Sequence, residues 1–229
     1  MRSKTSCFNK TVFRKNLLRF APVWGVYTLC LVVGILILYG NGGTMKQFHF
    51  ANNYINDMFS IMALMNLGYA LLVAQLLFGD LYNSRLCNAL HAMPVTREGW
   101  FVTHTASGLV CSFLPNLVLT LIAFPVLRVE AGWPGLLWWL LGAELQYIFF
   151  FGVAVLCVML SGNRLGQLAL YAMMNFAGLA AWWLASVIYQ PLLPGIQFNG
   201  EVFYPFSPVA EIMEIVDHKP EPVPPEPEE

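Results

Sequence analysis

One carboxylate interrupts an apolar stretch of the chain. Glu144 lies in the run LLGAELQYIFF, where every flanking residue is apolar or uncharged. A carboxylate surrounded by hydrocarbon is costly unless it faces a helix bundle interior, water or a polar partner. Contact with a substrate and handling of a proton would both use such a residue, whereas a neutral carboxyl bonded to a nearby polar group is the commoner structural alternative. Glu144 is therefore a candidate intramembrane polar site whose role the sequence leaves open.

The segment from Gly79 to Trp100, GDLYNSRLCNALHAMPVTREGW, mixes apolar and polar residues at helical spacing. This pattern predicts a short helix at a membrane surface. Pro94 should end that helix, and Thr96 can cap the helix that follows. The segment either connects two spans or docks a cytoplasmic partner, and the pattern alone does not decide between these. Its apolar positions are Leu81, Tyr82, Leu86, Leu90 and Met93.

Motifs for enzymatic chemistry are missing from the sequence. No GxxxxGK[ST] phosphate loop occurs, since the glycine cluster from Gly40 to Gly43 lacks the following lysine. Ser107 lacks the first glycine of a GxSG nucleophile motif, and His104 lies only three residues from it. Neither HExxH nor CxxC is found. We therefore expect a non-enzymatic chain that holds no cofactor or metal of its own.

Composition places these residues in a membrane protein. Apolar residues make up 58% of the chain and charged residues 11%, against about 45–50% and about 25% in soluble domains. Five apolar stretches are each long enough to cross a bilayer, which takes about 20 helical residues. The sequence predicts an all-α, polytopic membrane helix bundle over residues 20–189. The five stretches are 20–39, 54–78, 100–127, 133–160 and 168–189.

Basic residues predict the orientation of this bundle. With the N-terminus inside, the inner segments hold nine lysines and arginines and the outer segments three, as expected for basic residues that stay cytoplasmic. Residues 1–19 then form a basic cytoplasmic segment, in which Cys7 to Arg19 is either an orientation signal or a surface helix. Residues 190–229 form an acidic, proline-rich tail outside. This charge distribution does not suit a nucleic-acid binder.

Three motifs resemble a known family. LFGDLYNSRLCNALHAMPVTREGWFVTH is similar to the loop after the second span in bacterial ABC transporter permeases of the type-two exporter superfamily. FNKTVFRKNLLRFAPVW resembles the entry segment and first span of these permeases, and FYPFSPVAEIM the stretch beyond their fifth span. The resemblance implies a multi-pass permease subunit in the bacterial cytoplasmic membrane. A separate ABC ATPase subunit would bind ATP and Mg, and a second permease copy or a paralogue would complete the assembly.

On this resemblance, loop 79–99 would rest in a groove of the ATPase. Such permeases usually have a sixth span, so five spans imply a truncated form or a missing part supplied by a partner. A non-catalytic membrane sensor or an immunity-type protein is the alternative function, and a membrane-embedded enzyme is a weaker one. The expected docking residues are Asp80, Arg85, Leu86, Leu90, His91, Met93, Pro94 and Arg97.

Overall fold

The computed structural model describes residues 8–42, 50–83, 96–127 and 132–192. Helices fill almost all of these ranges, and the described residues contain no strand. The predicted all-α bundle is therefore confirmed. The elements are α1 (Lys10–Arg19), α2 (Ala21–Gly42), α3 (Phe50–Leu77), the 3-10 turn η1 (Gly79–Tyr82), α5 (Arg97–Leu127), α6 (Gly132–Leu160) and α7 (Arg164–Leu192).

Five of these helices, α2, α3, α5, α6 and α7, coincide with the five apolar stretches of the sequence. Three are long and apolar enough over their described residues to cross a membrane, and the bent pair of α1 and α2 raises the number to four. Within α3, Met62–Leu77 is a shorter apolar helix. These dimensions fit a membrane protein, while the count of five spans and their orientation stay predictions. The three spans are Arg97–Ile122, Leu137–Leu160 and Arg164–Ile188.

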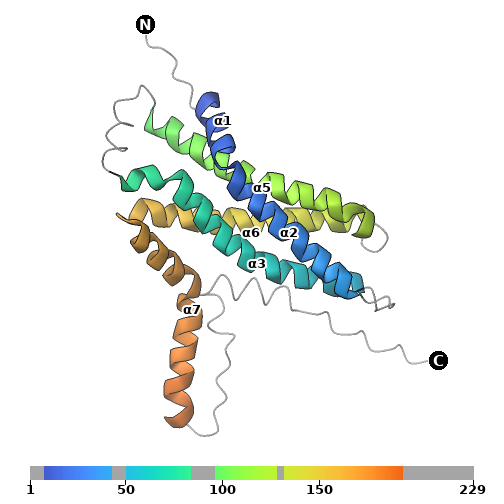
Figure 1. Cartoon of the computed structure of the whole chain (residues 1–229). Helices are drawn as coiled ribbons and strands as arrows, with labels where there is room; N and C mark the ends of the chain where they lie inside the picture. Colours follow the sequence, from blue (N-terminus) through green and yellow to red (C-terminus); the bar gives the residue numbers. More distant parts are fainter. Residues whose placement is uncertain (1–7, 43–49, 84–95, 128–131, 193–229) are drawn as a thin grey trace, which may run out of the picture.

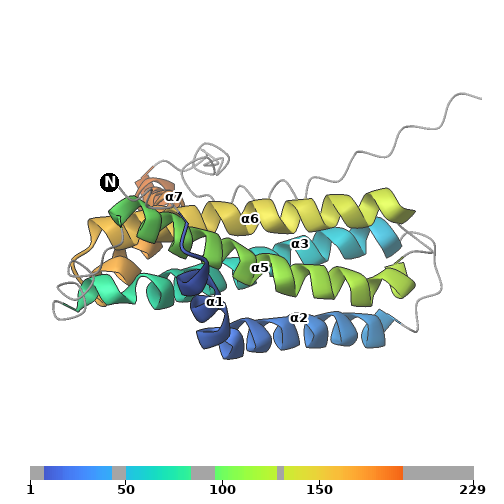
Figure 2. The same cartoon turned by 90° about the horizontal axis from the view of Figure 1, so that it is seen from above.

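The helices α2, α3, α5 and α6 lie side by side as an elongated bundle (Figures 1 and 2). α6 contacts α3, α5 and α7, and α5 also contacts α1 and α2. α7 begins beside the end of α6 and then leaves the bundle at an angle (Figure 1). The core therefore lies between α3, α5 and α6, where the side chains of all three helices are buried.

Small residues are buried on α3 and α6, two helices that contact each other. Five alanines on these helices are 0% exposed, and side chains of this size allow two backbones to approach closely. In lipid, close packing of this kind drives helix association, because hydrocarbon offers no hydrophobic gain between helices. Large side chains such as Tyr147 and Phe150 fill the remaining space at 0% exposure. The buried alanines are Ala63, Ala70 and Ala74 on α3 and Ala143 and Ala154 on α6.

A glycine brings α5 against α6. A Cβ atom on Gly108 would lie 2.9 Å from both Cε atoms of Phe151 and closer still to its Cζ. The Phe151 ring has little room to move, since it is 2% exposed and stacks on Tyr147 with ring centroids 5.5 Å apart. The Tyr147 hydroxyl donates a hydrogen bond to the Gly108 carbonyl oxygen at 3.0 Å. Gly108 therefore permits a contact that no larger residue allows without a shift.

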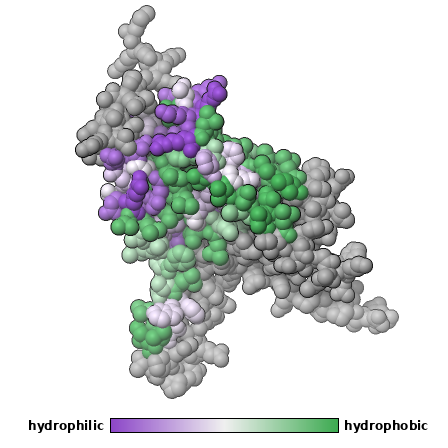
Figure 3. All heavy atoms as spheres, viewed as in Figure 1, coloured by the Kyte–Doolittle hydropathy of each residue, from purple (hydrophilic) through white to green (hydrophobic). Residues whose placement is uncertain are grey.

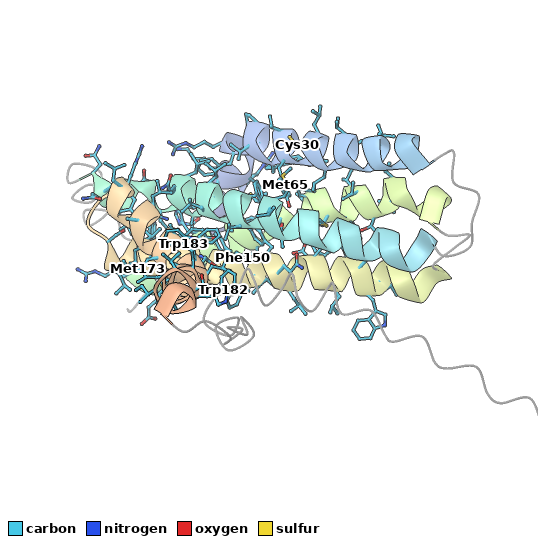
Figure 4. All side chains as sticks on the ribbon, turned by 90° about the horizontal axis from the view of Figure 1, so that it is seen from below. Cys30, Met65, Phe150, Met173, Trp182 and Trp183 are labelled. Atoms are coloured by element: carbon cyan, nitrogen blue, oxygen red, sulfur yellow. The ribbon has the colours of Figure 1, made fainter. Side chains whose placement is uncertain are left out.

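The outer surface of the bundle is rich in apolar side chains (Figure 3). Trp138 is 71% exposed, Leu121 66% and Trp183 62%, whereas soluble monomers rarely expose large contiguous apolar patches. Trp182 and Trp183 lie on α7, the helix that diverges from the bundle (Figure 4). Lipid is the medium in which such a surface is stable.

Candidate functional site

Charged side chains gather at one end of the bundle. The six basic side chains that the structure describes lie on α1 or in the first turns of α5 and α7, and Asp80 and Glu98 lie at the same end, where α3 ends and α5 begins. The hydrophilic patch over α1 and the start of α5 is visible in Figure 3. We call this region the charged end. Its residues are Lys10, Arg14, Lys15, Arg19, Asp80, Arg97, Glu98 and Arg164.

α1 is a helix of its own, bent by 54° from α2. Asn9 caps it, accepting hydrogen bonds from the backbone N–H groups of Thr11 and Val12. The N–H of Asn9 donates to Thr103 Oγ1 at 3.1 Å, which ties α1 to α5. The four basic residues of α1 are exposed, whereas Asn16 is buried. Of the two interpretations open for this segment, the surface helix is the one that matches these contacts.

Tyr82 anchors the beginning of loop 79–99. Its hydroxyl donates to Gln167 Oε1 at 2.8 Å and lies 3.3 Å from Ser161 Oγ. Burial raises the pKa of Tyr82 above its ordinary value, so the hydroxyl keeps its proton and remains a donor at neutral pH. The loop therefore starts from a point fixed to the α6–α7 connection.

Phe78 joins the beginning of loop 79–99 to its end. It is 0% exposed, and its ring centroid lies 5.6 Å from that of Trp100 and 6.0 Å from that of His104. Thr96 caps α5 as predicted, accepting from the N–H of Gly99 at 3.2 Å. His104 Nδ1 lies 2.9 Å from the Trp100 carbonyl oxygen. The histidine near the start of the third predicted span is thus a hydrogen-bonded packing residue.

Only part of the predicted docking set lies in the described ranges. Asp80 lies in η1 and is half-buried, and Arg97 is exposed in the first turn of α5. Leu81 and Tyr82 lie in the 3-10 turn η1, which ends there because Asn83 is extended. The rest of the predicted surface helix lies outside the described residues and stays a prediction. The other docking residues lie outside the described residues, and their role stays a prediction. They are Arg85, Leu86, Leu90, His91, Met93 and Pro94.

Glu144 has polar partners on α5. Asn116 Nδ2 donates to Glu144 Oε1 at 2.8 Å, and Ser112 Oγ donates to the same oxygen at 3.5 Å. Asn116 Nδ2 also lies 3.3 Å from Ser112 Oγ. Sequence reasoning found the carboxyl but missed both partners. Their four-residue spacing puts them on one face of α5, yet nothing in the sequence says that this face meets Glu144.

Two tyrosines form hydrogen bonds close to this carboxyl. The Tyr27 hydroxyl on α2 donates to Asn66 Oδ1 on α3 at 2.6 Å, and Asn66 Nδ2 donates to the Ala143 carbonyl oxygen at 3.3 Å. The Tyr69 hydroxyl donates to the carbonyl oxygen of Cys111, the residue before Ser112, at 2.8 Å. The Tyr27 and Tyr69 rings stack 3.7 Å apart. Four helices therefore meet through polar bonds at the level of Glu144.

Removal of one partner from the Tyr27–Asn66 bond should lower stability more than removal of both. Tyr27→Phe leaves a buried amide oxygen without a donor, and Asn66→Leu leaves a buried hydroxyl without an acceptor, so each should cost about 1–2 kcal/mol. The double variant removes both polar groups and should cost less than the sum of the two. Thermal unfolding of the purified variants in one detergent measures this. Strictly additive losses would contradict a direct bond.

Comparison with known proteins does not assign this arrangement to a family. Comparison finds no matching family model, no matching curated protein and no matching solved structure. Across the ranges that the structure describes, no group of three or more His, Cys, Asp or Glu side chains could hold a metal ion. Function is therefore inferred from two features of the chain itself, the charged end and the cluster at Glu144.

Proposed function

We propose that this chain is the transmembrane subunit of an ATP-driven exporter of the ABC type, located in the bacterial cytoplasmic membrane. A separate ATPase docks on loop 79–99 from the cytoplasmic side. The single observation that carries this proposal is the position of the loop. It leaves the bundle at Phe78 and re-enters at Trp100, at the end where the described basic side chains gather.

The charged end faces the cytoplasm in this proposal. All six basic side chains in the described ranges lie there, Arg97 and Arg164 among them, and basic residues next to membrane spans are retained on the cytoplasmic side. The ATPase binds ATP in the cytoplasm, so on this proposal it lies on the same side of the membrane as loop 79–99. The kind of partner follows from the resemblance of the loop, centred on Arg85 to Arg97, to the corresponding loop of type-two permeases.

The contacts of the loop would carry movement into the bundle. Displacement of the loop pulls on η1. The hydrogen bond from the Tyr82 hydroxyl in η1 to Gln167 passes this movement to α7. The displacement also pulls on the first turns of α5, where Thr103 accepts the bond from Asn9 that holds α1. Packed helices move as rigid bodies rather than bend continuously. Closure of the ATPase would therefore tilt α3 and α5 and shift α1 and α7 with them.

In this proposal the ATPase partner binds ATP and Mg²⁺. The chain has no phosphate-binding loop motif, so energy reaches it through contact alone. A second copy of the chain, or a paralogue, would complete the membrane unit. Sites for the transported molecule then lie inside the membrane part, where Glu144 is a charged side chain in an apolar setting.

Replacing Leu90 and Met93 with aspartate should abolish binding of the ATPase. Apolar anchors at a docking surface are each worth about 2 kcal/mol or more, so two charges in their place should reduce co-purified ATPase by about tenfold or more. The measurement is co-purification, in mild detergent, with the cognate ABC ATPase. Leu165→Asp is the matched control, because Leu165 is 78% exposed at the same end but lies on α7.

Two results would refute the docking surface. Undiminished co-purification of the double aspartate variant is the first. The second is equal loss in the Leu165→Asp control, which would show that any charge at this end disturbs the complex. ATP turnover that this subunit stimulates and vanadate inhibits should fall in parallel with co-purification.

A further inference from the structure

A recess lies between α2 and α3 next to the charged end. The rings of Tyr27 on α2 and Tyr69 on α3 stack 3.7 Å apart and hold the two helices together. Between this stack and the charged end the helices leave a space of about 200 Å³. The residues that line it are mostly apolar and include Phe20, Val23 and Trp24 on α2, Tyr69 and Val73 on α3, and Cys111 on α5.

The recess is open to the medium around the bundle. Phe20, Val23 and Trp24 are half-buried, so part of each side chain faces outward. The Trp24 indole N–H donates to the Leu17 carbonyl oxygen at 3.3 Å, and tryptophan is enriched at the level of lipid headgroups. From Phe20 to Tyr27 the recess runs about two helical turns, or about 10 Å, along α2. An acyl chain can therefore enter it from the headgroup level.

A positive charge lies beside this recess. The Arg19 guanidinium lies over the ring of Phe20, a lining residue, with Cζ 5.5 Å from the ring centroid. Lys15 precedes Arg19 by four residues, so the two share one face of α1, and both are exposed. The first acidic residue of the whole chain is Asp57. Since like charges four residues apart destabilise a helix, an anion bound at this end of α1 would stabilise it.

We propose that the recess binds one anionic phospholipid. Its headgroup lies against Arg19 and Lys15, and one of its acyl chains enters the space between α2 and α3. Phosphate forms charge-assisted hydrogen bonds with a guanidinium, and basic pockets between membrane helices bind anionic headgroups. Charge selects the class of lipid, because a zwitterionic headgroup has no net charge to set against two basic side chains. Neither Arg19 nor the recess belongs to loop 79–99, so this proposal does not rest on ATPase docking.

A lipid titration tests the site in the unaltered protein. The full chain is purified in a neutral detergent, and its thermal unfolding is followed as dioleoylphosphatidylglycerol or dioleoylphosphatidylcholine is added. These lipids share their acyl chains and differ in net charge. A basic side chain near an anionic lipid is worth about fivefold in affinity, so with two such side chains phosphatidylglycerol should reach half of its maximal effect at a mole fraction at least about tenfold lower.

Two results of this titration would overturn the lipid site. The first is equal potency of the two lipids. The second is equal stabilisation by inorganic phosphate, which carries the charge without an acyl chain. No ATPase is present in this experiment, so its failure and the failure of the docking proposal are distinguishable.

A pair of glutamine variants distinguishes the site from a general attraction of anionic lipid to the charged end. Arg19→Gln removes the charge beside the recess and should reduce the advantage of phosphatidylglycerol by about fivefold. Arg164→Gln removes an exposed charge at the same end of the bundle, but on α7, and should keep the advantage. Equal reductions in the two variants would overturn the site, because the recess would then have no part in the preference.

Fluorescence quenching locates the acyl chain. Bromine atoms on the chains of phosphatidylglycerol quench tryptophan on contact, and Trp24 lines the recess. At the mole fractions that stabilise the protein, Trp24→Phe should lose this quenching, whereas Trp183→Phe, which removes an indole 62% exposed on α7, should keep it. Unchanged quenching in Trp24→Phe would place the lipid elsewhere and overturn the proposal. Should Trp24→Phe fail to fold, the titration and the glutamine pair still decide.

Discussion

Gly108→Val is expected to lower the unfolding temperature of the purified chain by several degrees. The valine side chain would occupy the space of the Phe151 ring, which cannot swing away because it is buried and stacks on Tyr147. Overpacking of this kind costs about 1–3 kcal/mol and occasionally more, and about 2–4 °C per kcal/mol is typical at this chain length. Thermal unfolding in detergent, followed by circular dichroism or by tryptophan fluorescence, measures the loss.

Gly152 provides the matched control for this variant. It is a helical glycine one residue from Phe151, and a Cβ atom there meets nothing within 4 Å. Gly152→Ala should therefore keep the unfolding temperature or raise it slightly, since alanine is about 1 kcal/mol better than glycine within a helix. Phe151→Leu should restore part of the stability of Gly108→Val. Equal losses at Gly108 and Gly152 would show that the close contact of α5 with α6 is not the cause.

Phe78→Ala should be the most damaging single change at the charged end. The ring is fully buried and contacts Trp100, Phe101 and His104 at the start of α5. Loss of a buried aromatic side chain costs about 3–5 kcal/mol. Because Phe78 joins the two ends of loop 79–99, the variant should lose bound ATPase as well as thermal stability.

Leu76→Ala is the control for the loss of thermal stability and the loss of bound ATPase that we expect of Phe78→Ala. Leu76 lies two residues before Phe78, in the last turn of α3, but is 42% exposed, so its truncation should change the unfolding temperature little and leave co-purification intact. A Phe78→Ala protein that unfolds at the original temperature would contradict the role of this side chain in the core. Full retention of the ATPase by a destabilised Phe78→Ala protein would contradict its role in the loop.

The helices were predictable because the thickness of a bilayer sets their length. Each of the five apolar stretches became a helix whose ends lie within four residues of the predicted ends, as for Arg164–Leu192 against 168–189. The Thr96 cap was predictable for a local reason, since a capping side chain bonds to backbone within the next turn.

Contacts between helices were not predictable from one sequence. The partners of Glu144 lie 28 and 32 residues away on α5, and their meeting depends on the rotation of both helices. Without that rotation, nothing distinguishes Ser112 and Asn116 from other polar residues in an apolar span. Gly108 likewise gives no sign in the sequence that Phe151 packs on it. The local sequence therefore predicted where the helices lie along the chain. The contacts that bring Ser112 and Asn116 to Glu144 depend on how the helices pack.

The gathering of the described basic side chains at one end of the bundle opposes inversion of the protein in its membrane. Inverting the bundle in its membrane would carry the side chains of Lys10, Arg14, Lys15, Arg19, Arg97 and Arg164 through hydrocarbon. Each transfer costs about 2.5–3.5 kcal/mol even on the most lenient scale, and the sum exceeds the thermal energy many times over. An inverted copy is therefore strongly disfavoured, and the bundle is expected to keep the orientation that it adopts during synthesis.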